Sequence, residues 1–288
     1  MVMVRATLSR SVLPNNDVAK LALAFAELSA SDLDASLILF EHAKYNHAIF
    51  LLQQAVEKAT KAVGLLLGLV KPTRKDLMKV GHTTILGILL RYSERVEELR
   101  SQIELVSKSP GLEAAKREFE GLGLKWTLPE PSEMMQRLPS KETALQQIPM
   151  VRSLQPEELW DVTLRFDPSN PRVAVTIKML DDAESQWKGI DEFALFLDRT
   201  ARFLGDPEWH RYHLNISGKA FPEVAPLSFA TMWHEHEPRY PPIETDDYWD
   251  PGRYSADSGI VRIYPRLFKH AKRLCEGTIA GAKAALKM

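Results

Sequence analysis

The feature that most constrains the fold is an apolar pattern at helical spacing between Tyr45 and Val70. The apolar positions step by four and three residues, which places them on one face of an α-helix. They are Ala48, Leu52, Ala55, Ala59, Ala62, Leu66 and Leu69, with Ile49, Val56, Val63 and Val70 alongside. We therefore expect this helix to contribute a broad and continuous part of the core.

The whole segment from Asp17 to about Lys108 is almost free of proline and keeps the helical pattern. Ser31 and Asp34 have the spacing of a capping box, which predicts a break in the first helix near Ser29. Pro72 is expected to end the second helix, and a third follows from 85 to 104. Three antiparallel helices with short links indicate a bundle.

From about Pro110 to Asp191 the sequence is interrupted by prolines and has the texture of an insertion with loops. The run Val173–Ile177 is rich in β-branched residues and is the best strand candidate. A strand needs a partner, and Asp161–Phe166 is the best one available. The expected fold is thus mainly α, an antiparallel helical bundle with a loop-rich insertion that has room for a small β-hairpin.

The carboxyl-terminal third returns to helix at 192–204, and a loop rich in aromatic residues and histidine is expected from Gly205 to Tyr254. The last helix is predicted to begin near Pro265, because proline is well suited to a first helical turn. Its buried face should consist of Leu267, Ala271, Leu274, Thr278, Ala282 and Ala285.

Composition narrows the class of partner and the compartment. The 37 Lys and Arg nearly balance the 38 Asp and Glu, so any attraction to nucleic acid or anionic lipid must be local. The single cysteine, Cys275, excludes an internal disulfide and fits a reducing compartment. The first residues lack the features of a secretory signal, and the longest apolar run, 63–70, is too short for a bilayer. We expect a cytoplasmic protein without a membrane segment.

Three segments resemble the HEPN family, whose name abbreviates higher eukaryotes and prokaryotes nucleotide-binding. Asp32-Leu33-Asp34-Ala35 is similar to the acidic and apolar first helix of that family. The stretch from Tyr45 to Ala62 resembles its Tyr-x-x-Ala and Gln-Gln-Ala-x-Glu-Lys-x-x-Lys-Ala signature. Gly81-His82 resembles the opening of its third helix, and the three segments occur in the family's order.

A shorter segment, Glu237-Pro238-Arg239-Tyr240-Pro241, resembles the Arg-Tyr-Pro sequence that leads many HEPN proteins into their final helix. The resemblance then implies a bundle built from residues 15–106 and 190–288. Residues 107–189 would be an insertion about which the resemblance says nothing.

The resemblance implies an all-α bundle that is usually a homodimer. Such proteins bind nucleotide, RNA or a partner nucleotidyltransferase, often within toxin–antitoxin or anti-phage systems.

Many members cleave RNA with an arginine followed by four to six residues and a histidine. No arginine here has that spacing. The intervals from Arg74 to His82, from Arg202 to His210 and from Arg262 to His270 are one residue too long, and the interval from Arg266 to His270 is one too short. We therefore expect binding rather than cleavage, with no cofactor. His82 with Arg239 is the substitute pair if RNA is cleaved, and a structural partner of a nucleotidyltransferase is a third alternative.

The expected binding residues are cations that neutralise phosphate and a tyrosine that stacks or forms a hydrogen bond. They are Lys58, Lys61, His82, Arg239 and Tyr240, with Arg266, Lys269 and Arg273 as additional phosphate contacts. Lys61 also lies one turn from Glu57, so the polar face of the second helix is equally explained by an ion pair.

The cations of the last helix have two interpretations as well. Arg266, Lys269, His270 and Arg273 share one helical face, which suits a row of phosphates. That face could instead pack beside the acidic residues of the preceding loop, which include Glu223, and be neutralised by them.

A metal site is the rival function, because histidines and carboxylates alternate in the loop before the last helix. The residues are His210, His213, His234, Glu235, His236 and Glu237. No cysteine accompanies them and no HEXXH motif occurs, so we interpret the segment as a polar loop with aromatic anchors and expect no metal. No phosphate-binding P-loop, Gly-x-Gly-x-x-Gly or Gly-x-Ser-x-Gly motif is present.

Overall fold

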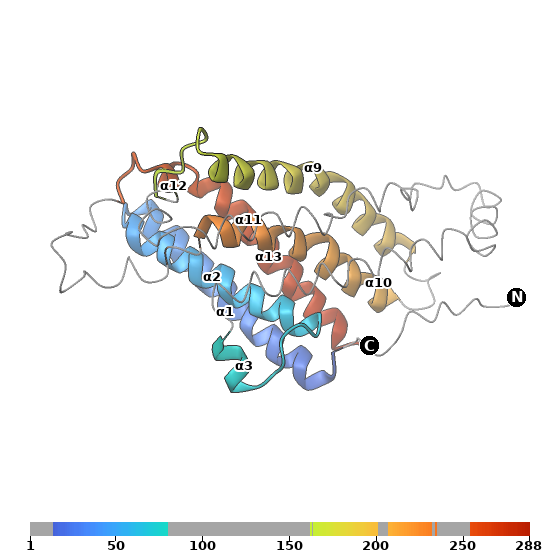
Figure 1. Cartoon of the computed structure of the whole chain (residues 1–288). Coiled ribbons are helices and arrows are strands. Elements are labelled where there is room, and N and C mark those ends of the chain that lie inside the picture. Colours follow the sequence, from blue (N-terminus) through green and yellow to red (C-terminus); the bar gives the residue numbers. More distant parts are fainter. Residues whose placement is uncertain (1–13, 80–161, 163, 201–206, 232–233, 235–253) are drawn as a thin grey trace, which may run out of the picture. The chain divides into compact units, whose positions relative to one another are not determined.

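The computed structural model describes residues 14–79, 162, 164–200, 207–231, 234 and 254–288. The chain divides into two compact units, residues 1–11 with 86–153 and residues 12–85 with 154–288, and every described residue lies in the second. Its described elements are all helical (Figure 1). They are α1 (Asn16–Glu41), α2 (Tyr45–Leu66), α3 (Arg74–Lys79), α9 (Pro171–Thr200), α10 (Pro207–His213), the π-helix η3 (Leu214–Ala220), α11 (Phe221–Thr231), α12 (Gly259–Arg262) and α13 (Tyr264–Ala285).

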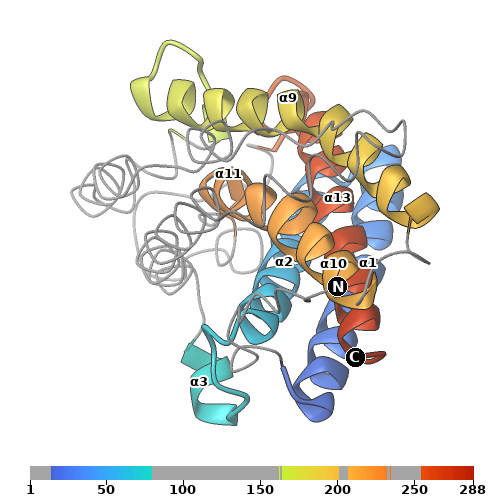
Figure 2. The ribbon, with the colours of Figure 1, turned by 90° about the vertical axis from the view of Figure 1, so that its right-hand side faces the viewer.

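All eleven apolar residues of the core stripe expected on the second helix are buried. The helix itself ends at Leu66 with a turn at Gly68, so Leu69 and Val70 lie beyond it and the expectation that Pro72 ends it is wrong. The short turn from His42 to Lys44 joins α1 and α2 into an antiparallel pair. The two helices lie side by side in Figures 1 and 2 and pack along their lengths. The mainly helical bundle is therefore confirmed for the described residues.

The expected break in α1 does not occur, since the helix runs without interruption from Asn16 to Glu41. The capping-box residues have other uses in the folded chain. Asp32 pairs with Lys58 of α2, and Ser31 is exposed. Asn15 caps the helix instead, because its side chain accepts a hydrogen bond of 2.9 Å from the amide of Val18.

The last helix is confirmed as predicted. Pro265 lies in the first turn of α13, and all six residues expected on its buried face are buried. Although α13 is at the other end of the chain, it packs against α1 and α2 and also against α10, η3 and α11. The amino-terminal helices and the carboxyl-terminal helix thus share one core.

Two serine hydroxyls of α1 join the helices of this core. Ser36 Oγ donates to the Ala48 carbonyl over 2.7 Å, and Tyr264 Oη lies 2.7 Å from the same Oγ. A hydroxyl has one proton to donate, so Tyr264 must be the donor to Ser36. Ser29 repeats the arrangement between α2 and α13, with Oγ 2.6 Å from the Ala55 carbonyl.

The single cysteine is part of this second set of contacts. Cys275 Sγ lies 3.0 Å from Ser29 Oγ, and its residue is buried. Burial raises the pKa of the Cys275 thiol to about 11, despite the hydrogen bond with Ser29. The residue is a protonated part of the core.

The strand expected at Val173–Ile177 is wrong, because these residues form the first turns of α9. Asn170 precedes the helix and accepts a hydrogen bond from the amide of Arg172, while Pro171 occupies the first position. The buried residues recur at helical spacing: Val173, Thr176, Leu180 and Ala183. Packing of this face outweighs the strand preference of the β-branched residues. In the expected partner strand, residues 162, 164 and 165 are helical too.

The loop expected from Gly205 to Tyr254 is also wrong where the structure describes it, since residues 207–231 form α10, η3 and α11. Their buried residues follow a helical spacing: Tyr212, Ile216, Ala220, Val224 and Leu227. Tyr212 reaches α2, where its hydroxyl donates to the Leu66 carbonyl over 2.6 Å. This bond satisfies a carbonyl at the end of α2 that has no partner within its own helix.

Some expectations lie outside the described residues. The third helix at 85–104 and most of the insertion at 107–189 are among them. Helix α9 spans 171–200 and so runs across the expected boundary between residues 189 and 190.

Both helices of the α1–α2 pair end in the same type of turn. The amide of Lys44 donates to the Leu39 carbonyl over 2.8 Å, and the amide of Leu69 donates to the Gly64 carbonyl over 2.8 Å. These are the bonds of a Schellman motif, which requires a left-handed residue just after the helix. Gly68 has this conformation after α2 with a φ of 66°, whereas Ala43 has it after α1 with a φ of 55°.

The two turns give a reciprocal test of helix termination. Gly68→Ala should lower the free energy of unfolding by about 1 kcal/mol, because an added Cβ is disfavoured at positive φ. Since nothing lies within 4 Å of that Cβ, the loss is conformational. Ala43→Gly should raise stability by a smaller amount, because glycine also gains freedom in the unfolded chain. Urea unfolding followed by circular dichroism measures both changes. If the two substitutions shift the free energy of unfolding in the same direction, the assignment of the two Schellman turns is contradicted.

Candidate functional site

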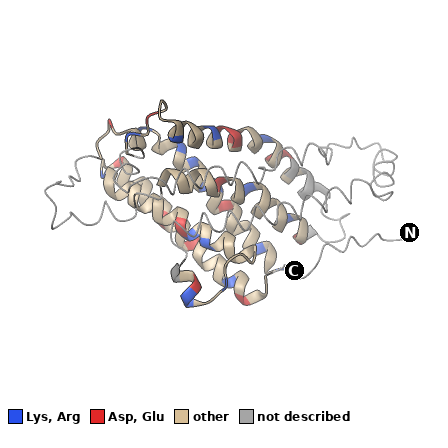
Figure 3. Ribbon diagram, viewed as in Figure 1, with Lys and Arg blue, Asp and Glu red and all other residues tan. Residues whose placement is uncertain are grey.

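The two lysines predicted on the second helix lie beside carboxylates. Lys58 of α2 pairs with Asp32 of α1, and Lys61 Nζ lies 2.5 Å from Glu57 Oε1 one turn away. The Lys61 side chain is 14% exposed, so little of it faces solvent. Figure 3 shows acidic and basic positions next to each other on α2. The ion-pair interpretation of this face is the one that the geometry favours.

The predicted cations of the last helix differ among themselves. Arg266 pairs with Asp181 and with Glu184, whose Oε1 lies 2.8 Å from Arg266 Nε. Arg273 Nη1 lies 3.1 Å from Asp191 Oδ2. Lys269 is exposed, and no described residue forms an ion pair with it. Of the three, Lys269 is the cation that faces solvent without a carboxylate partner in the described part of the chain.

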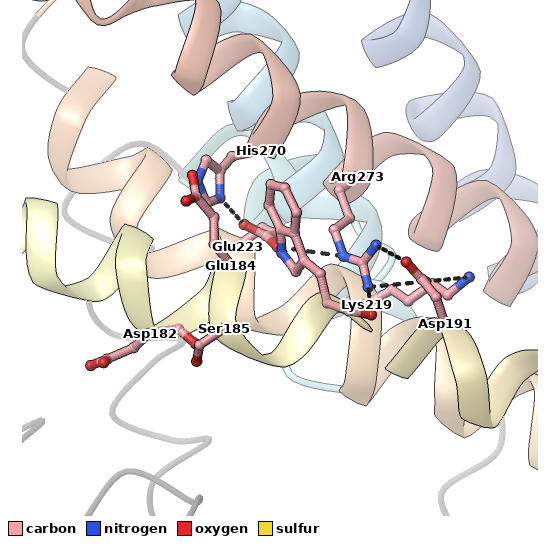
Figure 4. A network of polar contacts seen from close by, with 9 residues as sticks. Asp182, Glu184, Ser185, Asp191, Lys219, Glu223, His270 and Arg273 are labelled. Carbon is pink, nitrogen blue, oxygen red and sulfur yellow. Dashed lines mark hydrogen bonds and ion pairs between the residues drawn. The ribbon is translucent and has the colours of Figure 1, made fainter. Parts of the chain in front are cut away.

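The centre of this charged region is His270, which is fully buried on α13. Its Nδ1 lies 2.5 Å from Glu223 Oε2 of α11, and its Nε2 lies 3.0 Å from Glu184 Oε1 of α9 (Figure 4). Both ring nitrogens thus lie within hydrogen-bond distance of a carboxyl oxygen. His270 therefore ties α9 and α11 to α13.

Glu223 is the most deeply buried acid of the network, at 1% exposed. Its Oε1 accepts a hydrogen bond of 2.7 Å from Trp187 Nε1 and lies 3.8 Å from Arg273 Nε. The Trp187 ring also lies 4.8 Å from the His270 ring and 5.2 Å from the Arg273 guanidinium carbon. The Glu223 carboxylate and the Trp187 indole thus each contact both the His270 imidazole and the Arg273 guanidinium.

The network extends along α9 at both ends. Arg266 and His270 both donate to Glu184, and these hydrogen bonds outweigh the effect of burial, so the pKa of Glu184 lies below its ordinary value. At the other end Asp191 accepts from Arg273 and lies 3.6 Å from Lys219 Nζ of η3. Three cations, Lys219, Arg266 and Arg273, together with the imidazole of His270, face four acids, Asp181, Glu184, Asp191 and Glu223.

Arg266 and His270 miss the spacing of the ribonuclease motif by one residue, and their contacts show whether they are free for catalysis. Arg266 and His270 are one helical turn apart and share Glu184 as their acceptor. His270 has no exposed surface and uses both ring nitrogens. A general acid or base must reach the proton that it transfers, so His270 in this position cannot act on a phosphodiester.

The histidines considered as metal ligands in the sequence have separate surroundings where the structure describes them. His234 is fully buried, and its Nδ1 lies 2.6 Å from the Tyr254 hydroxyl. Burial lowers its pKa to about 3. Burial together with the nearby His210 lowers the pKa of His213 to about 4. Among the described residues there is no group of three or more metal-ligating side chains. Glu235, His236 and Glu237 lie outside them.

Three predicted site residues, His82, Arg239 and Tyr240, lie outside the described residues. Their candidacy stays a prediction. No helix in the described part of the chain has both the length and the apolar character that a membrane span needs.

Comparison with known families supports the resemblance noted in the sequence. Residues 24–109 match the family model of the HEPN domain. The match contains most of α1 and the whole of α2 and α3. The resemblance is therefore confirmed for this part of the chain, whereas α9 to α13 lie beyond it. No curated protein and no solved structure matches the chain.

Sequence reasoning found the cations of α13 but missed most of the groups that hold them. Glu223 was named among the acids of the preceding segment, but Glu184, Trp187 and Asp191 were not singled out. Their signal was present, since Glu184 and Asp191 are seven residues apart, as are Arg266 and Arg273. It becomes visible only when residues 171–200 are known to be a helix.

Glu223 provides a test of the network. Glu223→Ala should lower the free energy of unfolding by about 3–5 kcal/mol, because it leaves His270 Nδ1 and the Trp187 N–H without a hydrogen-bond partner and removes an ion pair with Arg273. Urea unfolding followed by circular dichroism measures the loss. The matched control is Glu192→Ala on α9, whose side chain is 68% exposed. A loss no larger than that of the control would contradict the network.

The buried His234 predicts a loss of stability in acid. Its folded pKa of about 3 lies well below the ordinary value near 6.5. The unfolded chain therefore binds a proton that the folded chain excludes, and stability falls as the pH drops below about 6.5. At pH near 5 the loss should be roughly 2 kcal/mol from this residue. Thermal unfolding across this range should depend less on pH in His234→Gln than in the wild type, whereas the exposed control His47→Gln should behave as the wild type.

Proposed function

We propose that this chain binds RNA or nucleotide and does not cleave it. The observation that carries the proposal is the HEPN match over residues 24–109, a family named for nucleotide binding. The match includes Lys58, Lys61 and His82, three of the residues that the resemblance marks for binding. The bundle supplies a rigid support for such a site, because α1 and α2 share their core with α13.

The absence of cleavage is supported from two directions. No arginine of the sequence is followed by histidine at the spacing of the cleaving members. One of the pairs that miss this spacing by a single residue, Arg266 and His270, is held by Glu184 and Glu223, and the imidazole is fully buried. A displaced pair such as His82 with Arg239 is the alternative that the experiment below must exclude.

The face of α13 is the best-supported phosphate contact among the described residues. Lys269 is exposed on the same helical face as Arg266 and Arg273. Lys58 and Lys61 of α2 each pair with a carboxylate, whereas Lys269 pairs with none among the described residues, so we place the two lysines of α2 second. Arg239 and Tyr240 stay in the proposal on the strength of the resemblance.

Other parts of the proposal rest on the resemblance alone. They are a homodimer and a role in a toxin–antitoxin or anti-phage defence system. A cytoplasmic location is proposed on a different basis, the single cysteine, which fits a reducing compartment. A nucleotidyltransferase is the proposed protein partner if RNA is not the ligand.

A salt titration tests binding and cleavage in one sample. We expect the purified protein to bind labelled single-stranded RNA, measured by fluorescence anisotropy in EDTA. The affinity should fall steeply as salt rises from roughly 50 to 200 mM, while the RNA stays intact on a denaturing gel. Lys269→Gln should reduce the slope of log affinity against log salt by about 0.7, the value for one lost phosphate contact on a single strand. Lys20→Gln, which removes an exposed lysine of α1, is the matched control.

The outcomes separate the three functions. Cleaved RNA in EDTA would contradict the non-catalytic proposal and favour the ribonuclease, and cleavage should then be lost in His82→Ala or Arg239→Ala. Displacement of RNA by ATP would favour a mononucleotide site. Intact RNA without binding would contradict the proposal and turn the search to a protein partner that copurifies with the chain.

A further inference from the structure

We infer that α9 closes the RNA-binding face of α13, with its carboxylates in the place that RNA phosphates take when the face is open. The face consists of Arg266, Lys269 and Arg273. The inference rests on the proposed function and goes beyond it, because it makes RNA binding at this face conditional on the displacement of α9.

The acids of α9 match the cations of α13 in register. Glu184 meets Arg266, and seven residues later Asp191 meets Arg273, which is also seven residues beyond Arg266. Seven residues are close to two helical turns, so each row stays on one face of its helix. The two helices therefore present a row of negative charge to a row of positive charge, as an RNA backbone would.

Helix α9 is attached differently along its length. The buried apolar residues of its first half are Val173, Leu180 and Ala183. Beyond Ala183, the contacts of α9 include those of Glu184, Trp187 and Asp191 with charged or polar groups of α11, η3 and α13. Residues 173–183 therefore act as an anchor, and beyond them the carboxylates of Glu184 and Asp191 occupy places on α13 that another anion can take.

The ion pairs of Arg266 are the ones that a competing anion reaches first. Its side chain is 28% exposed, and those of Asp181 and Glu184 are 60% and 37% exposed. Pairs between partly exposed groups are weak and are screened by salt. Lys269 is exposed on the same face and offers a first contact to the RNA. Arg273, at 14% exposed and beside Trp187, would be released later.

The chemistry of the occupied face favours phosphate over other anions. A guanidinium donates two parallel hydrogen bonds to a carboxylate or a phosphate, and Arg266 already donates from Nε and Nη2 to two acids. A strand of RNA offers several such acceptors in succession, which matches a row of cations better than a single small anion does. The buried pair of His270 and Glu223 is not part of the exchange.

The test removes the carboxylates that hold Arg266 without changing side-chain shape. In the double variant Asp181→Asn with Glu184→Gln, the amide oxygen introduced at position 184 still accepts a hydrogen bond from His270. The matched control is Asp182→Asn with Glu192→Gln, which removes two charges from exposed positions of the same helix. Figure 4 shows Asp182 on the side of α9 that points away from His270.

We expect the double variant at 181 and 184 to bind single-stranded RNA several-fold more tightly than the wild type at low salt. Its slope of log affinity against log salt should be steeper by about 0.7, because Arg266 gains a phosphate contact. The control should bind nearly as the wild type does. In the wild type, hydrogen exchange of the amides at 184–191 should become faster when RNA is added, and those at 173–183 should stay protected.

Several results would overturn the inference. Equal gains in both double variants would assign the effect to overall charge. RNA binding by the wild type with no gain at 181 and 184, or slower exchange at 184–191 with RNA, would overturn the closed face and leave the proposed function intact. Absence of binding by every variant would overturn both.

Discussion

The buried carboxylate of Glu223 is the group on which the arrangement of the carboxyl-terminal helices depends. At 1% exposed it cannot be hydrated, so its charge is tolerated only with strong donors around it. His270 and Trp187 lie within hydrogen-bond distance of it from α13 and α9, and Arg273 forms an ion pair with it at 3.8 Å. Such a cluster adds less stability than apolar packing of the same volume would, but it accepts very few relative positions of its helices. We infer that its main contribution is to fix where α9 and α11 lie on α13.

The other side of α13 is held by different forces. Against α1 and α2 the contact is apolar, with small side chains that let the helices approach closely. The only shared polar groups we describe there are Ser29 and Ser36, and each is satisfied by a carbonyl and a second donor. The HEPN match ends at residue 109, yet the core of α1 and α2 is completed by a helix that begins at Tyr264. The matched segment therefore needs the carboxyl-terminal part of the chain to bury its apolar face.

The sequence predicted those elements whose buried face has a clear helical period. The stripe of α2 and the face of α13 are of this kind, and both were found residue by residue. The errors arose where a local signal competed with that period. At Val173–Ile177 the β-branched residues suggested a strand, and at Ser31–Asp34 a capping box suggested a helix start. Both signals describe a short segment alone, and packing against other helices outweighed them.

The sequence predicts the cations of the candidate site and, among their acidic partners, Glu57 and Glu223 but not Glu184 and Asp191. From the sequence, Lys58, Lys61, Arg266 and Arg273 are four positive charges on helical faces. In the fold each has a carboxylate partner, two of them from a helix far away in the sequence. Helical spacing places charges on a face, but it does not say which other helix covers that face.

The nearly neutral charge of the chain therefore has a local counterpart. Around His270, the cations Lys219, Arg266 and Arg273 face four acids within one cluster, so counting lysines and arginines overstates the positive surface that RNA would meet. An anion can bind strongly here only by exchange with an acid already in place. Exchange costs little for the partly exposed pairs of Arg266 and much for the buried pair of His270 and Glu223, because desolvated charges lose more when a partner leaves. The same network can thus hold its centre fixed while its rim changes partners.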